Sequence, residues 1–203
     1  MTSLKARPSL SAIVLAGGQS SRMGQDKALI AIDGVPLLRR VCEAALQCTS
    51  DVSVVTSWVD RYRFLLPPTV DLLVEVNPQG PLLGFAQALR HKATHGQNNR
   101  QTDWVLLLAC DLPNLQGERL QEWLKILENV PSGAIALLPK NPKGWEPLCG
   151  FYRRDCLAEL EDFTAQGGRS FQKWLAKQTV QELLLDCPDM MFNCNTPDDL
   201  AMT

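Results

Sequence analysis

Short apolar runs rich in β-branched residues alternate along the chain with longer stretches in which apolar residues recur at helical spacing. This alternation is typical of an α/β domain, in which helices cover the faces of a sheet. Segment 104–109 is almost continuously apolar, which indicates a strand covered on both faces. The segments predicted to be strands are 11–15, 52–56, 70–76, 104–109, 134–138, 148–152 and 180–185.

Helices are predicted between these strands. The first begins at Pro36, whose backbone angle suits the first helical turn. Its predicted buried face consists of Leu37, Leu38, Val41, Ala44 and Ala45. The other predicted helices span residues 82–94, 117–129, 155–166 and 170–177. A final helix start is predicted near the end of the chain, with Thr196 as N-cap and Pro197 in the first turn.

The composition predicts a single globular domain over residues 1–203, because 45% of the residues are hydrophobic and 21% are charged. The formal net charge of −2 argues against a general affinity for nucleic acid or anionic membranes. Lys5 and Arg7 precede an apolar run that imitates a secretory signal, but glycines and charges end this run early. No other stretch approaches the roughly 20 apolar residues of a membrane span. We therefore expect neither a membrane nor a nucleic-acid partner.

Seven cysteines are scattered along the chain, and none forms a Cys-x-x-Cys pair. Zinc sites and dithiol redox sites therefore lack the spacing that they need. Reduced thiols in a reducing compartment are the simpler interpretation, which predicts a cytoplasmic protein. A catalytic cysteine is not favoured either, because His91 and His95 lie together and no cysteine has a recognisable local motif.

A glycine-rich segment follows the first predicted strand directly. Residues 15–27 are Leu-Ala-Gly-Gly-Gln-Ser-Ser-Arg-Met-Gly-Gln-Asp-Lys. Glycines let a backbone approach a ligand closely, so the amides of such a loop can converge on phosphate oxygens. Arg22 and Lys27 add positive charge opposite a polyanion. The spacing matches neither the Walker pattern nor Gly-x-Gly-x-x-Gly, and a solvated turn is the plainer alternative.

This segment resembles the signature Leu-Ala-Gly-Gly-x-x-x-Arg-Met-Gly-x-Asp-Lys of the molybdenum cofactor guanylyltransferases, and the resemblance spans nearly the whole chain. It implies a three-layer α/β/α fold with a mostly parallel twisted sheet, the Rossmann-like fold of the nucleotide-diphospho-sugar transferases. It also implies that five residues of this segment bind the nucleotide: Leu15, Ala16, Gly17, Gly18 and Lys27.

Two further segments support the resemblance. Gly80-Pro81-Leu82-Leu83-Gly84 resembles a Gly-Pro-Leu-x-Gly turn of the family, which implies that Gly80 lies near the nucleotide and Gly84 near the pterin substrate. From the residues alone, this is a strand-to-helix turn whose amides can face an anion, or a plain helix start. Asp111 follows the apolar segment 104–109, where open α/β sheets place ligand-binding carboxylates.

The family has its metal-binding aspartate in a Cys-Asp-x-Pro context like that of Asp111. Mg²⁺ prefers oxygen ligands and usually takes one or two carboxylates plus substrate phosphates. We therefore expect Mg²⁺ as the cofactor, Asp111 as its ligand, and Lys27, Asp111 and Arg22 as the catalytic residues. A loop-capping role is the alternative for Asp111.

Four side chains, in addition to the Gly-Pro-Leu turn, are predicted to bind the pterin substrate. Asn193 and Asn195 stand in a segment resembling the Asn-x-Asn-Thr-Pro ending of the family, and amides can pair with the donors and acceptors of a pterin. Turn capping is equally compatible with these asparagines. Arg22 and Arg169 are candidates for binding the acceptor phosphate, with a solvated side chain as the alternative for Arg169.

Two positions depart from the family pattern. The family often has Asn where Thr56 stands, and an Asp shortly before the Gly-Pro-Leu turn, where Glu75 or Val76 aligns. These positions help to hold the base and ribose in the family. Glu75 retains a carboxylate that can accept a hydrogen bond from guanine or ribose.

The resemblance implies transfer of GMP from GTP to the terminal phosphate of molybdopterin, with release of pyrophosphate. Gly17 favours GTP over CTP, because cytidylyltransferase relatives typically have Leu-Ala-Ala-Gly in this loop. A cytidylyltransferase and a nucleotide-binding protein without transfer activity are the alternatives, and a sugar-phosphate transferase ranks third because its Gly-x-Gly-Thr-Arg-Leu loop is absent. Hand-off of a labile cofactor also suggests transient contacts with molybdoenzymes or cofactor chaperones.

Overall fold

The computed structural model describes residues 8–17, 26–95, 103–185 and 188–192. Within these residues an eight-stranded sheet has the order β10-β7-β9-β6-β1-β4-β5, and β8 pairs with β7 off this path. Its strands are β1 Leu10–Leu15, β4 Val52–Thr56, β5 Asp71–Val74, β6 Trp104–Ala109, β7 Ala136–Asn141, β8 Gly144–Trp145, β9 Cys149–Arg153 and β10 Val180–Leu183.

Most neighbouring strands of the sheet are parallel. β1 is parallel to β4 and β6, β4 to β5, and β7 to β10. β9 is antiparallel to both β6 and β7. The carboxyl ends of β1, β4, β5, β6 and β7 therefore lie at one edge of the sheet, together with the amino end of β9. The predicted, mostly parallel α/β sheet is confirmed.

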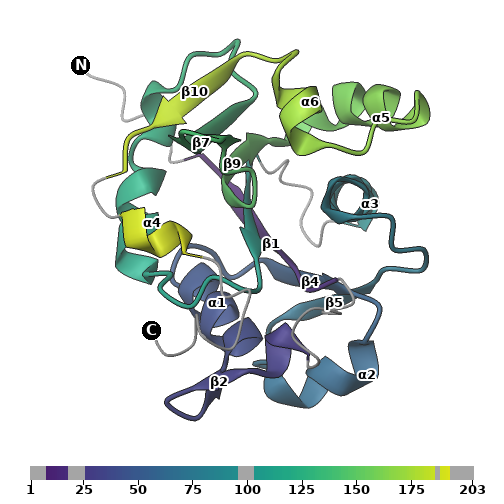
Figure 1. Cartoon of the computed structure of the whole chain (residues 1–203), viewed down its shortest axis with the longest axis vertical. Helices are drawn as coiled ribbons and strands as arrows, with labels where there is room; N and C mark the ends of the chain where they lie inside the picture. Colours follow the sequence, from purple (N-terminus) through teal and green to yellow (C-terminus); the bar gives the residue numbers. More distant parts are fainter. Residues whose placement is uncertain (1–7, 18–25, 96–102, 186–187, 193–203) are drawn as a thin grey trace.

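Helices cover both faces of this sheet and produce three layers (Figure 1). α1 and α4 pack on one face, and α3, α5 and α6 on the other. The alternation of side chains in β1 shows why: Ala12 and Val14 join the core under α1 and α4, while Ile13 and Leu15 join the core under α3. The helices are α1 Leu37–Leu46, α2 Val59–Tyr62, α3 Pro81–His95, α4 Gly117–Leu124, α5 Leu157–Ala165 and α6 Phe171–Leu175.

Some elements differ from the sequence-based expectation. The helix predicted over 117–129 ends at Leu124, and a separate 3-10 helix, Leu127–Asn129, follows it. The strand predicted over 70–76 is shorter, at Asp71–Val74. A hairpin of β2 (Ala31–Ile32) and β3 (Val35–Pro36) was not predicted. It turns at Asp33 and Gly34, whose φ angles are 52° and 78°, and an Asp-Gly pair is a recognised signal for such a turn.

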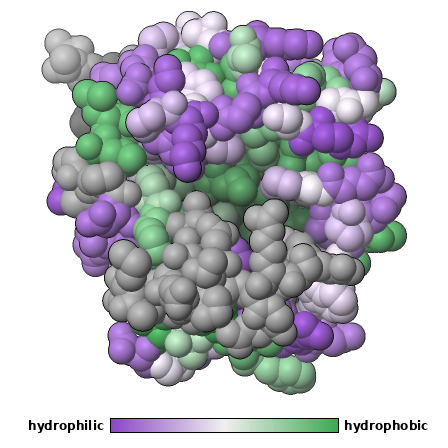
Figure 2. All heavy atoms as spheres, viewed as in Figure 1, coloured by the Kyte–Doolittle hydropathy of each residue, from purple (hydrophilic) through white to green (hydrophobic). Residues whose placement is uncertain are grey.

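The face of the molecule seen in Figure 2 has an apolar hollow near its centre, with hydrophilic residues above it and to its right. Most apolar residues of the strands are buried, and every residue of β6 is buried. Among the described residues, the helices are too short or too polar to cross a membrane.

Candidate active site

Three residues with predicted roles lie at the carboxyl edge of the sheet. Gly17 follows β1, Glu75 follows β5 and Asp111 follows β6. The ends of β1 and β6 are joined by a hydrogen bond of 3.1 Å from the amide of Cys110 to the carbonyl of Leu15. Open α/β sheets bind their ligands at this edge. These residues are therefore candidates for one site.

An ion pair between Lys27 and Asp111 lies at this edge. Lys27 Nζ is 3.1 Å from Asp111 Oδ2, although the two residues are 84 positions apart in the sequence. Lys27 is the last residue of the glycine-rich segment and the first residue of a 3-10 helix, Lys27–Leu29. The side chains are partly buried, with exposed fractions of 18% and 20%. The fold thus brings together a cation suited to phosphate oxygens and a carboxylate suited to a metal ion.

The surroundings of Asp111 fit a metal ion that is shared with substrate phosphates. Among the described residues, no group of three or more His, Cys, Asp or Glu side chains could hold a metal ion. Mg²⁺ does not need such a group, because it usually keeps several waters and binds one or two carboxylates plus phosphates. A single partly buried carboxylate beside a lysine is compatible with that mode.

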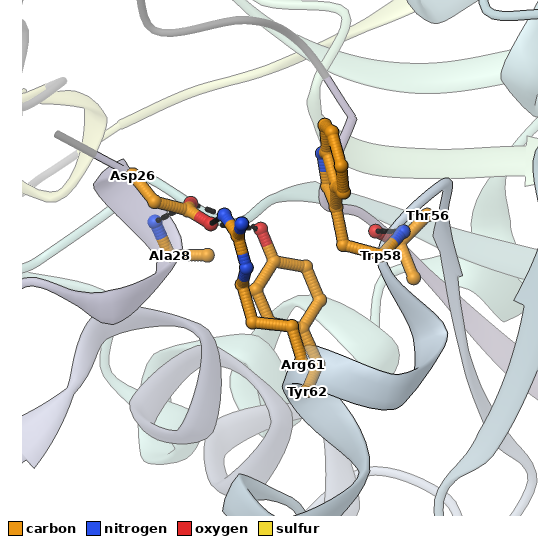
Figure 3. Close-up of polar contacts among 6 residues, drawn as sticks. All are labelled: Asp26, Ala28, Thr56, Trp58, Arg61 and Tyr62. Carbon is orange, nitrogen blue, oxygen red and sulfur yellow. Dashed lines mark hydrogen bonds and ion pairs between the residues drawn. The ribbon is translucent and has the colours of Figure 1, made fainter. Parts of the chain in front are cut away.

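Asp26, directly before Lys27, is held by three donors (Figure 3). Tyr62 Oη lies 2.9 and 2.7 Å from the two carboxylate oxygens, and Arg61 Nη1 pairs with Oδ2 at 2.9 Å. Asp26 Oδ1 also accepts from the amide of Ala28 at 3.1 Å and thereby caps the 3-10 helix. Because Lys27 is the first residue of that helix, these contacts fix the backbone from which its side chain projects.

The roles of Arg61 and Tyr62 were not predicted from the sequence. Both residues belong to α2, a four-residue helix that the periodicity does not indicate. Tyr62 is 2% exposed, and its pKa is raised by burial and by its hydrogen bond to Asp26, so its hydroxyl remains a neutral donor. Arg61 also stacks on Trp58, with its guanidinium carbon 4.8 Å from the ring centroid.

Glu75 is wedged between two glycines of the site. A Cβ atom added at Gly17 would lie 2.5 Å from Glu75 Oε2, and one added at Gly84 would lie 3.2 Å from Oε1. Glycine at these two positions therefore leaves room for the carboxylate between the glycine-rich segment and the first turn of α3. This contact gives Gly17 and Gly84 a physical role that the sequence alone does not reveal.

The carboxylate of Glu75 has unused acceptor capacity. Glu75 is 7% exposed, and no side-chain or backbone donor among the described residues bonds to its carboxylate. Its backbone is fixed, since its amide donates to the Thr56 carbonyl and its carbonyl accepts from Ser57 Oγ, both at 2.9 Å. Burial raises the pKa of the Glu75 carboxyl group. Buried polar groups are normally hydrogen-bonded, so Glu75 is suited to N–H groups of a ligand.

Similarity to known proteins identifies the family. Residues 12–182 match the family described as the MobA-like NTP transferase domain. A protein of Nostoc sp. named probable molybdenum cofactor guanylyltransferase is 58% identical over 193 residues, covering 95% of this chain and 89% of the relative. The chain belongs to the molybdenum cofactor guanylyltransferase family. A molybdenum cofactor guanylyltransferase of Pseudomonas putida is 32% identical over 202 residues, covering 96% of this chain and 97% of the relative.

A solved structure supports the same fold. Molybdopterin-guanine dinucleotide biosynthesis protein A from Archaeoglobus fulgidus matches with a TM-score of 0.71 at 25% identity, and the match covers 95% of each chain. The three-layer nucleotidyltransferase fold implied by the family resemblance is therefore confirmed.

Thr56 and Gly80 have clear local roles in this member of the guanylyltransferase family. Thr56 is fully buried, and its hydroxyl oxygen accepts from the amide of Trp58 at 3.0 Å, which braces the turn after β4 (Figure 3). Gly80 has a φ of 97°, a conformation that favours glycine. Its carbonyl accepts from the amides of Leu83 and Gly84 at 3.2 Å each, so it begins α3. Nucleotide contact by Gly80 stays a prediction.

Arg169 lies after α5 and before α6. Its Nη1 atom donates to the carbonyls of Thr164 at 3.0 Å and Gly168 at 2.8 Å. The guanidinium group therefore binds the carbonyl end of α5, which favours a cation there. Its predicted contact with an acceptor phosphate stays a prediction.

Gly18, Arg22, Asn193 and Asn195 lie outside the described residues, as does the helix start predicted at Thr196. The described segment before these asparagines is a 3-10 helix, Pro188–Met191. It lies beside the loop after β6, because Asn114 Nδ2 donates to the Asp189 carbonyl at 3.3 Å.

Proposed function

We propose that this protein transfers GMP from GTP to the terminal phosphate of molybdopterin, yielding the guanine dinucleotide cofactor and pyrophosphate. The observation that carries the proposal is the Lys27–Asp111 pair, in which Nζ and Oδ2 are 3.1 Å apart at the carboxyl edge of the sheet. Relatives that cover nearly the whole chain are named for this guanylyltransferase activity.

The reaction is a displacement at the α-phosphorus of GTP. A phosphate oxygen of molybdopterin forms the new bond to this phosphorus, while the bond to the bridging oxygen breaks and pyrophosphate leaves with that oxygen. The attacking oxygen is already ionised and needs no strong general base. Positioning and charge stabilisation should therefore provide most of the rate enhancement.

The residues at the carboxyl edge of the sheet have separate proposed roles in this reaction. Lys27 binds phosphate oxygens of GTP and stabilises the charge on the leaving pyrophosphate. Asp111 would hold Mg²⁺, which supplies charge neutralisation on the phosphates when it is bound. Asp26 keeps the backbone of Lys27 in place through Tyr62 and Arg61.

Glu75 is proposed to recognise the nucleobase. Guanine presents two adjacent donors, N1–H and the 2-amino group, which match the two oxygens of a carboxylate. Cytosine and adenine place a ring-nitrogen acceptor beside their amino group, so a carboxylate there would face a lone pair. The buried position of Glu75 beside Gly17 thus favours GTP over CTP.

Product identification tests this proposal. The protein is incubated with molybdopterin, Mg²⁺ and each of the four nucleoside triphosphates in turn, and the dinucleotide is analysed by mass spectrometry. We expect a guanine dinucleotide from GTP and little product from CTP. A cytosine dinucleotide would instead identify a cytidylyltransferase, and tight binding of GTP without any product would identify a nucleotide-binding protein that lacks transfer activity.

A further inference from the structure

The two substrates of the proposed reaction share one hydrogen-bonding edge. Guanine and the pterin ring of molybdopterin both contain a 2-amino-4-oxo-pyrimidine, in which an amino group and a ring N–H point in the same direction. A carboxylate that accepts from both donors suits either ring. Glu75 can serve one of them, and a second carboxylate at the same edge can serve the other.

Glu146 lies at the same edge of the sheet. It stands between β8 and β9, and its amide donates to the carbonyl of Pro139 in β7 at 2.9 Å. Two residues later, the carbonyl of Leu148 accepts from the amide of Ala109 at the end of β6 at 2.8 Å. Asp111 lies two residues after the end of β6, so Glu146 lies on the β7–β9 side of the catalytic pair.

Glu75 lies on the opposite side of that pair. In the order β7-β9-β6-β1-β4-β5, the Glu75 carboxylate reaches Gly17 after β1. Neighbouring strands are about 4.8 Å apart, so two to three spacings place roughly 10–14 Å between the backbone at Glu146 and that at Gly17. Asp111 follows β6, which lies between β9 and β1 in this order, so it stands between the Glu146 and Gly17 positions along the edge.

The local contacts leave one oxygen of Glu146 available. Asn141 Nδ2 donates to Glu146 Oε1, and among the described residues no donor is bonded to Oε2. Burial raises the pKa of Glu146, while the bond from Asn141 and the charge of Lys143 oppose that change. The carboxylate is thus oriented by Asn141 and partly shielded from water.

The hairpin that carries Glu146 is anchored to α6. The amide of Trp145 donates to Gln172 Oε1 at 3.2 Å, and its carbonyl accepts from Gln172 Nε2 at 2.6 Å. This double contact fixes the backbone next to Glu146. Supporting contacts of this kind preorganise a binding residue. The contact of Oε1 with Asn141 braces the hairpin and leaves Oε2 available to a ligand.

We propose that Glu146 binds the pterin ring of the acceptor by accepting hydrogen bonds from its 2-amino group and N3–H. The inference rests on the proposed function, since it assigns the acceptor of that reaction. Glu75 and Glu146 then recognise the same chemical edge on two different rings, one on each side of the Lys27–Asp111 pair.

Glu146→Gln tests the assignment with little structural change. The glutamine retains an oxygen that can accept from Asn141, but replaces Oε2 with an amino group. We expect the KM for molybdopterin to rise roughly 10- to 100-fold, as hydrogen bonds to a charged group are lost. The KM for GTP and the kcat at saturation should stay within about twofold of the wild type. Glu182→Gln, at an exposed position of β10, is the matched control.

Direct ring discrimination provides a second test that does not depend on turnover. Two fluorescent ligands are compared: 6-hydroxymethylpterin phosphate and its lumazine counterpart, which has a carbonyl in place of the 2-amino group. The change in fluorescence of each ligand measures its binding. The wild type should prefer the pterin at least 10-fold. Glu146→Gln should reduce or reverse that preference, because its amino group can donate to the lumazine carbonyl. A structural brace would weaken both ligands equally.

The outcomes separate the two proposals. If the wild type forms the guanine dinucleotide but Glu146→Gln leaves both the KM for molybdopterin and the ring preference unchanged, the role of Glu146 is refuted and the proposed function stands. If the wild type forms no dinucleotide and shows no preference for the pterin, both proposals fail. The assignment is supported if the wild type and Glu182→Gln prefer the pterin to the lumazine and Glu146→Gln does not.

Discussion

Gly17→Ala adds one methyl group where Glu75 meets the glycine-rich segment. The new Cβ would lie 2.5 Å from Glu75 Oε2 and 3.6 Å from the carboxyl carbon. Ordinary contact begins at 3.4 Å, so the carboxylate must retreat by about 1 Å. A shift of this size disrupts paired hydrogen bonds to guanine. Such bonds contribute about 1.5–3 kcal/mol, which corresponds to roughly a 10- to 150-fold loss of GTP affinity.

Two other glycines provide a graded comparison. At Gly84 the added Cβ would lie 3.2 Å from Glu75 Oε1, so we expect a smaller loss of affinity. At Gly133 it would meet nothing within 4 Å, and Gly133→Ala should bind GTP like the wild type. Titration calorimetry with Mg-GTP gives the three dissociation constants, and circular dichroism confirms the fold. Wild-type affinity in Gly17→Ala would refute the placement of Glu75 beside the base.

Three further predictions concern neighbouring side chains. Lys27→Met keeps the stem but removes the charge, and should weaken GTP binding at least tenfold while slowing transfer; a variant that retains both would contradict the role of Lys27. Tyr62→Phe removes the donor to Asp26 and should lower the free energy of unfolding by about 1–3 kcal/mol in urea titrations; an unchanged value would show that Asp26 does not depend on Tyr62. Since burial raises the pKa of Glu75 and protonation removes its charge, GTP affinity should fall as the pH decreases through that pKa. Glu75→Gln should abolish this pH dependence, and a flat wild-type profile would disprove it.

The central strands were predictable because their local pattern and their tertiary environment agree. Every residue of β6 is apolar and buried, so its hydrophobic pattern and its position in the core both indicate a central strand. The β2–β3 hairpin was overlooked although Asp33-Gly34 is a good turn signal, because its strands contain only two residues each. Short elements offer too few positions for a period to be seen.

The proximity of Lys27 and Asp111 is predictable from their positions relative to strands. Asp111 follows a buried strand and Lys27 ends the segment after the neighbouring strand, so both are expected at the carboxyl edge, where their side chains lie 3.1 Å apart. The bond from Tyr62 to Asp26 joins residues 36 positions apart, and no local pattern predicts it. The fit of Glu75 between Gly17 and Gly84 likewise depends on the packing of three separate segments.

The central claim, GMP transfer at the Lys27–Asp111 pair, is tested most directly by following the α-phosphate of GTP. GTP labelled at the α-phosphorus is incubated with Mg²⁺, molybdopterin and either the wild type or Asp111→Asn, and the label and the pyrophosphate are quantified. We expect the wild type to place the label in a guanine–pterin dinucleotide with one pyrophosphate per product, and Asp111→Asn to form neither. Label that remains in GTP with the wild type, or equal transfer by both proteins, would contradict the claim.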